Sequence, residues 1–421
     1  MPRLIGTVFV AASLALAVSA RAQATPWHPL PASPATSALV LWDHGGQERA
    51  AELAAMAPAL LQCRLARAKA KAPAVVAMLY VDGRRGAIVG TVPAAAAAEL
   101  VPFVQALLDD SADLPADAQA LAVAHAALRI DDEQCVRPGG VLRHAARTAL
   151  WPHRVPVPGD AKGIVAMPPT RLGELLRLPV RRVVAAAGAP SAALQSMLQA
   201  IAPAPAAAAH VASPAAVAGD GELRDVVHTF TDQPFVLVGF PVPVDADRGA
   251  LAVAVAAAHA RAAERWPLRG TELRSHASFA SFDWLAGDDL VAFCRRGVDD
   301  VQLLPGERAP GVDAERAATA AEVRDFVDDL RTRPLAAAEV EAARRARCLE
   351  IAVVAPSPGD PSSLAARLLA ATLAGECGIT QDAIEAVAPA AAGQALQALL
   401  AGRGTWHAVS PPPVSQRGFR R

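Results

Sequence analysis

The spacing of histidine and cysteine residues limits the metal chemistry open to this chain. None of the ten histidines lies four residues from another. The zinc-hydrolase motifs H-x-x-E-H and H-E-x-x-H both need that spacing, because imidazoles at i and i+4 share one helix face. The glutamate of these motifs acts as general base on zinc-bound water. The sequence therefore contains neither motif, and its five cysteines include no C-x-x-C pair of a zinc ribbon or thioredoxin-like site.

Other catalytic arrangements have little support. The sequence has no G-x-S-x-G nucleophile elbow and no Walker A phosphate loop. Asp43 and His44 are neighbours, but adjacent residues of a strand point to opposite faces, which favours a turn or edge position over an acid–base pair. Four isolated histidines are expected to be structural or to lie on the surface: His153, His228, His276 and His407.

Composition and charge narrow the class of protein. With 421 residues, 53% of them hydrophobic, the chain can bury a large core and is long enough for two or three domains. The 40 basic and 41 acidic residues nearly balance, and the basic runs contain no interleaved aromatic residues. These features exclude the electrostatic pattern of proteins that bind nucleic acids or anionic membranes.

The first 24 residues have the pattern of a secretory signal peptide. Arg3 precedes an apolar stretch from Leu4 to about Ala20, and the A-x-A site Ala22–Ala24 follows. The mature chain is expected to begin near Thr25, in the periplasm or outside the cell, with no membrane span after signal removal. An uncleaved membrane anchor is the alternative. In the oxidising compartment reached by export, the five cysteines form up to two disulfides or remain buried thiols.

A Pro/Ala/Gly-rich tract at 203–221 lacks helical or strand periodicity and is read as a linker between domains 25–202 and 222–421. Both halves mix strand and helix patterns, so the fold class is α+β. In the first half we expect strands at Ala38–Leu41, Val75–Val81, Gly86–Val92 and Arg182–Ala187, and helices at Glu48–Lys69, Ala94–Leu108, Ala116–Arg129, Pro169–Leu176 and Ser191–Ala202. In the second half we expect strands at Phe235–Phe240, Ser278–Leu285, Leu290–Cys294 and Thr405–Val409, and helices at Asp247–Glu264, Asp313–Leu330, Ala336–Cys348, Pro361–Leu373 and Thr380–Leu400.

An ordered series of phrases resembles the M16 (pitrilysin/insulinase/processing-peptidase) family. In the second half these are RGTELRSHASFASFDWLAGDDLVAFCRRG, TRPLAAAEVEAARR, PSSLAARLLA, ITQDAIEAVAPAAA and WHAVSP. In the first half VPVPGDAKGIVAMPPTRLGELLRLPVRRVVAAAG continues the similarity. The resemblance covers most of the mature chain. It implies two similar M16-like (LuxS/metallohydrolase-like) domains, each an antiparallel-rich sheet packed by helices.

The same resemblance locates a vacated zinc site. The family's motif H-L-L-E-H aligns with Ala59-Leu60-Leu61-Gln62-Cys63. Ala59 offers no ligand, Gln62 cannot accept a proton at neutral pH, and Cys63 is a single possible ligand. The nearest candidate for the family's third ligand is Glu133. Active relatives bind zinc, whereas no cofactor is expected here.

Further site residues follow from the resemblance. Cys63 and Cys135 both map near the vacated site, which suggests a disulfide in place of the metal crosslink. The family's substrate-binding Arg matches Arg274, and its Tyr falls at or near Phe279 or Phe282. The only tyrosine in the chain is Tyr80, so that pair is incomplete.

The resemblance implies a non-catalytic M16 homologue. Such a chain would pair with an active zinc-bearing M16 subunit, or with itself, and help to enclose a peptide substrate. One alternative is a metallopeptidase with a degenerate or shifted site. The other is a stand-alone protein that binds extended peptides by adding a strand to an exposed sheet edge.

Overall fold

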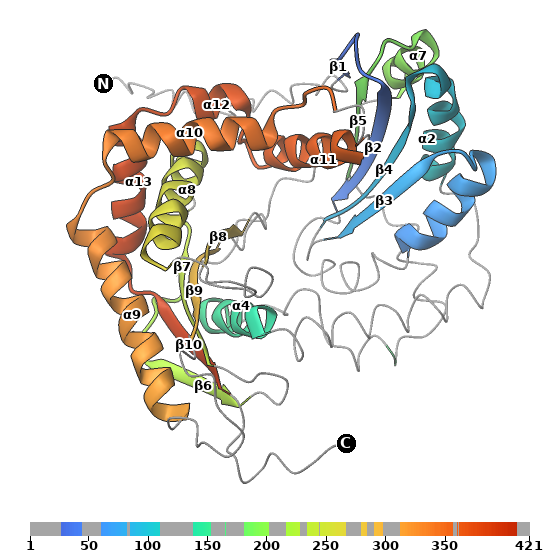
Figure 1. Ribbon diagram of the computed structural model, residues 1–421. Helices are drawn as coiled ribbons and strands as arrows, with labels where there is room; N and C mark the ends of the chain where they lie inside the picture. The colour runs from blue at the N-terminus through green and yellow to red at the C-terminus, as the bar shows by residue number, and fades with distance from the viewer. Residues whose placement is uncertain are drawn as a thin grey trace, which may run out of the picture.

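The computed structural model describes most secondary-structure elements of both halves of the chain. The described residues are 27–43, 60–81, 85–109, 138–152, 165, 181–201, 216–227, 234–243, 245–266, 279–283, 290–297, 312–356, 360 and 362–410. They form two five-stranded sheets with helices packed on both faces (Figure 1). The predicted α+β fold class is therefore confirmed. The domain boundaries at 202 and 222 stay a prediction.

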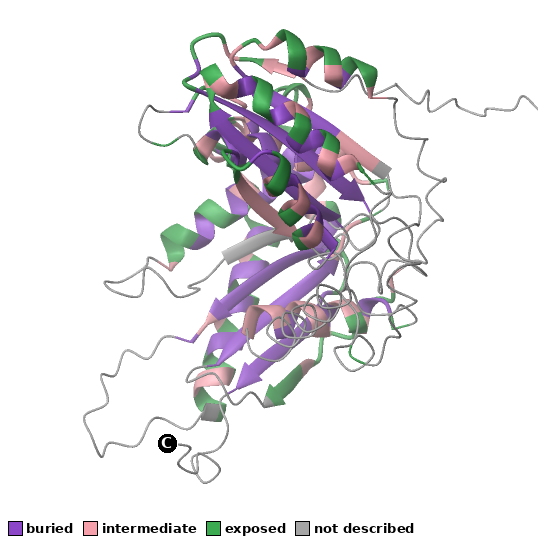
Figure 2. Cartoon of the chain, turned by 90° about the vertical axis from the view of Figure 1, so that its right-hand side faces the viewer, coloured by how far each residue is buried: buried purple, intermediate pink, exposed green. Residues whose placement is uncertain are grey.

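The first sheet has the strand order β1-β5-β2-β4-β3. Its strands are β1 Trp27–Pro29, β2 Ala35–Asp43, β3 Val76–Val81, β4 Arg85–Pro93 and β5 Arg181–Gly188. All neighbours pair antiparallel except β1 and β5, which run parallel. Every residue of β2 is buried, as expected for a central strand that is covered on both faces. The strands of both sheets are largely buried in Figure 2.

The second sheet repeats the first. Its order is β6-β10-β7-β9-β8, which is the same order when its strands are numbered from one. The strands are β6 Leu223–Val227, β7 Phe235–Pro241, β8 Phe279–Asp283, β9 Leu290–Arg296 and β10 Thr405–Ser410. The parallel pair again joins the first and last strands, here β6 and β10. The two halves are therefore copies of one module in topology.

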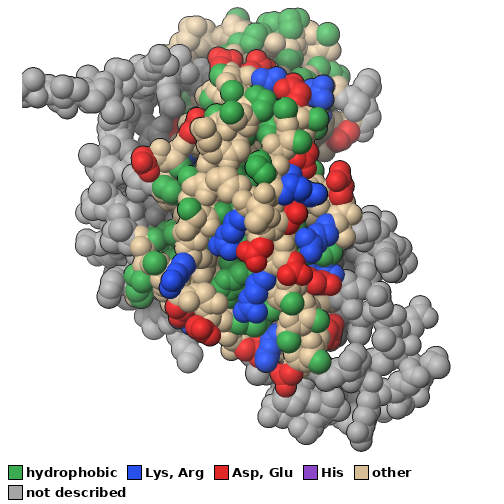
Figure 3. Space-filling view, turned by 90° about the vertical axis from the view of Figure 1, so that its left-hand side faces the viewer, with side chains coloured by type: hydrophobic (Ala, Val, Ile, Leu, Met, Phe, Trp, Pro, Cys, Tyr) green, Lys and Arg blue, Asp and Glu red, His purple; other side chains and the backbone are tan. Residues whose placement is uncertain are grey.

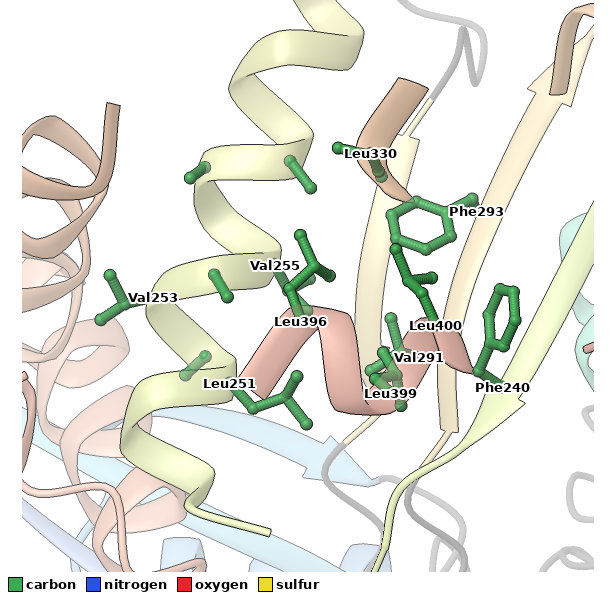
Figure 4. Close-up of a cluster of buried hydrophobic side chains, with 14 of the residues drawn as sticks. Phe240, Leu251, Val253, Val255, Val291, Phe293, Leu330, Leu396, Leu399 and Leu400 are labelled. Atoms are coloured by element: carbon green, nitrogen blue, oxygen red, sulfur yellow. The ribbon is translucent and has the colours of Figure 1, made fainter. Parts of the chain in front are cut away.

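One face of each sheet is covered by helices that belong to the same half of the chain as the sheet. On the first sheet these are a helix over 60–71, the 3-10 helix η1 Ala94–Glu99, α2 Leu100–Leu108 and α7 Ala192–Ala200. On the second they are α8 Arg248–Arg265, α9 Val312–Thr332, α10 Ala337–Ile351, α12 Gln381–Glu385 and α13 Pro389–Ala401. Figure 4 shows Leu396 of α13 beside Val255 of α8, and Leu399 and Leu400 beside Val291 and Phe293 of β9, in this second core.

The opposite face of each sheet is covered by a helix from the other half. Helix α4, Pro138–Leu150, packs on β7, β9 and β10 of the second sheet. Helix α11, Ser362–Glu376, packs on β2, β4 and β5 of the first sheet, as Figure 1 shows. Gly239 of β7 allows α4 to approach closely, because an added Cβ would lie 3.3 Å from Cβ of Ala146. The two halves thus exchange one helix each.

The outer surface of α9 and α10 carries interspersed basic and acidic side chains (Figure 3). Ion pairs within single helices include Arg331–Asp328 at 2.9 Å and Arg344–Glu341 at 2.8 Å. This pattern is typical of a solvated helix face. Within the residues that the structure describes, no helix combines the length and apolar character needed to cross a bilayer.

Several predicted elements need correction. The single helix predicted for Thr380–Leu400 is wrong: α12 ends at Glu385 and α13 begins at Pro389. Proline forces the residue before it out of the helical region, and Ala388 has the extended dihedrals φ −75° and ψ 145°. Helix α4 and the edge strands β1 and β6 were not predicted. The helices predicted at 116–129 and 169–176 lie outside the described residues.

Candidate functional site

The helix over 60–71 carries the part of the vacated motif that the structure describes. Leu61 is buried in the first core, Gln62 is exposed, and Cys63 is half-buried. Ala59 and Glu133 lie outside the described residues. The exposed Gln62 side chain and the half-buried Cys63 thiol are therefore the described side chains at the aligned catalytic positions. An amide is not a general base at neutral pH.

Burial alters the chemistry of Cys63. Desolvation raises the pKa of its thiol, and the nearby positive charge of Arg67 opposes that rise only in part. A thiol with a raised pKa stays protonated near neutral pH, whereas metal binding and nucleophilic attack need the thiolate. Its thiol is free in this structure, and Cys135 lies outside the described residues. The disulfide between Cys63 and Cys135 stays a prediction.

A buried arginine next to the motif fixes the helix 60–71 in place. Arg64 donates from Nη1 to the carbonyl of Leu107 at 2.9 Å, and its guanidinium lies 5.6 Å from the Trp42 ring centroid. Arg67 and Arg182 donate to the next carbonyls of the same helix end, Asp109 and Leu108, each at 3.2 Å. Cations are favourable at a helix C-terminus because its last carbonyls have no partner within the helix.

The second half has a matching contact. Arg261 of α8 is buried and donates to the carbonyls of Arg333 at 2.9 Å and Pro334 at 3.3 Å, directly after α9. It also forms a two-pronged ion pair with Glu339, at 2.9 and 2.6 Å. That pair raises the pKa of Arg261 and lowers the pKa of Glu339. In both halves, therefore, a buried arginine of the first long helix holds the end of the helix that follows the fourth strand.

Sequence reasoning missed this pair of arginines, although a signal exists for the first one. Leu61, Arg64 and Ala68 recur at helical spacing, so Arg64 falls on the buried stripe of its helix. A charged residue on such a stripe is rarely buried without a partner. That pattern predicts an anchored arginine.

The predicted substrate-binding residues are only partly described. Arg274 lies outside the described residues. Phe282 lies in β8, where it pairs with Val291 of β9. Tyr80 lies in β3 of the first sheet, so the single tyrosine is not on the strand of the second half that the resemblance pointed to.

His407 is buried in strand β10 of the second sheet, where its Nε2 lies 2.9 Å from Oγ1 of Thr405. Burial and the nearby Arg224 lower the pKa of His407 to about 4, with Asp220 opposing them. Among the described side chains, no three His, Cys, Asp or Glu residues gather into a group that could hold a metal ion.

Comparison with known proteins depends on structure, because no family profile and no curated protein matches the chain in sequence. A protease from Helicobacter pylori superposes with a TM-score of 0.63 at 13% identity, covering 93% of this chain and 98% of that one. A peptidase M16 inactive domain from Pseudomonas fluorescens gives 0.61 at 14% identity, over 94% and 96%.

A putative M16-like peptidase from Alicyclobacillus acidocaldarius gives a TM-score of 0.61 at 15% identity, over 93% and 97%. The chain has an M16-like fold. The resemblance found in the sequence is confirmed at the level of fold, over nearly the whole chain. A domain called inactive is among the proteins that share this M16-like fold.

Proposed function

We propose that this chain is a non-catalytic M16-like subunit that pairs with a zinc-bearing M16 peptidase, or with a second copy of itself, and helps to enclose peptide. The observation that carries the proposal is an M16-like fold over 93% of the chain combined with a sequence in which no two histidines are four residues apart. Such a chain retains the scaffold without the ligand pair of the zinc motif.

The site itself supports a role in assembly over catalysis. The helix 60–71 is anchored through Arg64 to the end of α2, so no metal is needed to hold it against the neighbouring helix. Gln62 presents an uncharged amide where an active relative needs a base. These features favour a structural role for this helix in a peptide-enclosing assembly over a catalytic role.

Mixing experiments with a zinc-bearing M16 peptidase from the same genome test the pairing. We expect the two chains to co-elute in size-exclusion chromatography, and cleavage of a fluorogenic peptide to rise on mixing. If the peptidase is equally active with and without this chain, and the two elute separately, pairing with it is wrong. A single species of twice the chain mass in the absence of any partner would support the self-dimer.

Peptide binding by strand addition is a second candidate, which one edge of the first sheet favours. The strand β3 reads VAMLYV, contains no charge or proline, and stands last in the described strand order, next to β4. Its first residue, Val76, is 69% exposed. By contrast, the edge strand β6 bears Arg224 and Asp225, and charged side chains discourage the addition of a further strand.

Charge placed on β3 tests this candidate. Val76→Lys is expected to weaken binding of a labelled alternating valine–threonine peptide roughly five-fold, as judged by fluorescence anisotropy. Val76→Thr, which keeps a β-branched uncharged residue, and Val226→Lys on the edge strand β6 are the matched controls. Equal affinity for all three variants would show that β3 is not the binding edge.

Export to the periplasm or the cell exterior is a further part of the proposal. It is supported by the signal-like pattern of residues 1–24. N-terminal sequencing of the mature protein should begin near Thr25. An intact Met1 on protein recovered from the membrane fraction would instead support the anchor.

A further inference from the structure

Two arginines lie against one tryptophan at the C-terminal end of α8, beside α9 and the second sheet (Figure 1). The guanidinium carbon of Arg295, from β9, lies 4.4 Å from the centroid of the Trp266 ring, and that of Arg265 lies 5.6 Å from it. The ring of Phe326, from α9, also packs on Trp266, with centroids 5.0 Å apart. Helix α9 thus fixes an indole ring that stabilises two cations.

Only one carboxylate accompanies these two cations among the described residues. Oε2 of Glu322, from α9, lies 2.5 Å from Nε of Arg295. Arg265 forms no ion pair with any residue that the structure describes. Arg265, Trp266, Arg295 and Glu322, here called the arginine–tryptophan cluster, therefore carry one positive charge in excess.

Arg295 is buried although its hydrogen bonds are incomplete. Its side chain is 7% exposed, and its Nη1 atom is buried with no hydrogen-bond partner in the described part of the chain. Burial lowers the pKa of Arg295, the charge of Arg265 lowers it further, and Glu322 offsets these two effects only in part. A buried cation without acceptors is unfavourable, because burial removes the water that would otherwise pair with it. The cluster therefore lacks a negatively charged acceptor.

The buried Arg261 of the same helix α8 shows what complete pairing looks like. Arg261 and Arg295 are each 6% exposed. Arg261 donates from Nε and Nη2 to both carboxylate oxygens of Glu339, and from Nη1 to the carbonyl of Arg333. All three nitrogens of its guanidinium group thus have acceptors. The missing partner of Arg295 is therefore not a general property of buried arginines in this fold.

A carboxylate has the chemistry of the missing acceptor. It is planar, accepts hydrogen bonds from a guanidinium group in the same plane, and carries the single negative charge that would balance the cluster. Glu322 contacts Nε of Arg295, which leaves the donors of Nη1 for a second carboxylate. The cluster also reaches the surface, since Arg265 is exposed and the Glu322 side chain is 45% exposed.

We infer that the arginine–tryptophan cluster is a carboxylate-binding site, in which Nη1 of Arg295 donates to the bound group and Arg265 closes over it. Nη1 is buried, so the flexible side chains of Arg265 and Glu322 move to admit the carboxylate. A small organic acid and the C-terminus of a peptide both present this group. The inference does not depend on pairing with a peptidase, and failure of that pairing leaves it unaffected.

Tryptophan fluorescence of the full chain during titration with sodium acetate tests the site, with sodium chloride keeping the ionic strength constant. We expect a saturable change in emission, which Trp266→Phe and Arg295→Gln abolish. Arg265→Gln should weaken acetate binding roughly ten-fold, because it removes a charge-assisted contact at the surface of the cluster. Arg324→Gln is the matched control and should bind as the wild type, since Arg324 is also exposed and lies 5.2 Å from the ring centroid of Trp406. Circular dichroism confirms that each variant is folded.

Two peptides distinguish the sources of the carboxylate. A short N-acetylated alanine peptide with a free C-terminus should bind if the site takes peptide ends, whereas binding of acetate alone identifies a small organic acid. The same peptide with an amidated C-terminus should not bind. Equal affinity of the wild type, Arg265→Gln and Arg324→Gln for acetate would overturn the inference, as would a change in emission that chloride reproduces. The two arginines would then serve only to fix the end of α8.

Discussion

Removal of the buried imidazole at His407 should weaken the acid sensitivity of the fold. His407 is 3% exposed, and its pKa is lowered to about 4 by burial and by Arg224, from an ordinary value of 6.5. The unfolded chain therefore takes up a proton below about pH 6.5, while the folded chain resists until about pH 4. The stability that comes from the neutral imidazole is complete above pH 6.5 and is lost as the pH falls through that window.

The size of this effect follows from the shift. A change from 6.5 to about 4, at ~1.4 kcal/mol for each pH unit, corresponds to roughly 3 kcal/mol between pH 7 and pH 4. The charged groups that act on His407 are Arg224 and Asp220, and Asp220 pairs with Arg224 at 2.6 Å. Protonation of His407 would place a second cation beside Arg224 in a buried setting.

Urea unfolding followed by tryptophan fluorescence, at a series of pH values, measures the effect. His407→Gln retains a hydrogen-bonding group near Thr405 but cannot titrate. Between pH 7 and pH 4 its free energy of unfolding should fall by about 3 kcal/mol less than that of the wild type. His259→Gln, which replaces an exposed histidine of α8, is the control substitution. An identical fall in the wild type and His407→Gln would show that the buried imidazole does not cause the acid sensitivity.

Further predictions concern the anchored helices and the cysteines. Arg64→Gln should lower the free energy of unfolding by about 2 kcal/mol, as it removes a charge-assisted hydrogen bond and a ring contact. Arg261→Gln should lower the free energy of unfolding by a similar ~2 kcal/mol, because its partner Glu339 is partly exposed and solvent screens the pair. If chemical denaturation shows that either variant loses less than about 0.5 kcal/mol, these contacts do not hold the helices. Non-reducing peptide mapping should find Cys63 linked to Cys135, and two free thiols would remove that disulfide.

The sequence reveals most of the strands because their patterns are strong. Continuous apolar runs such as Phe235–Phe240 predict buried strands, and the observed β7 extends one residue further. Helix α4 escaped prediction because Pro138, Gly139 and Gly140 at its start favour a loop, and its burial against the other half overrides that local preference. An exchanged helix depends on contacts that are distant in sequence, which local patterns do not contain.

The candidate site could be predicted in what it lacks but not in what replaces it. The spacing of histidines alone excludes the zinc motif, whereas the anchoring of Arg64 depends on the end of α2, which lies 43 residues away. The split between α12 and α13 was available from Pro389, which starts a helix more readily than it continues one. The edge strands β1 and β6 are short. Each pairs with the strand of its sheet that comes last in the sequence, and this pairing depends on contacts that are distant in sequence.

Metal content and peptidase activity of the purified full chain distinguish a non-catalytic M16-like subunit from a working metallopeptidase. We predict that elemental analysis finds less than one zinc ion per chain. We also predict that the chain alone shows no chelator-sensitive cleavage of a fluorogenic peptide. Stoichiometric zinc together with chelator-sensitive cleavage by this chain alone would contradict the account, because it would require a metal site outside the aligned motif positions.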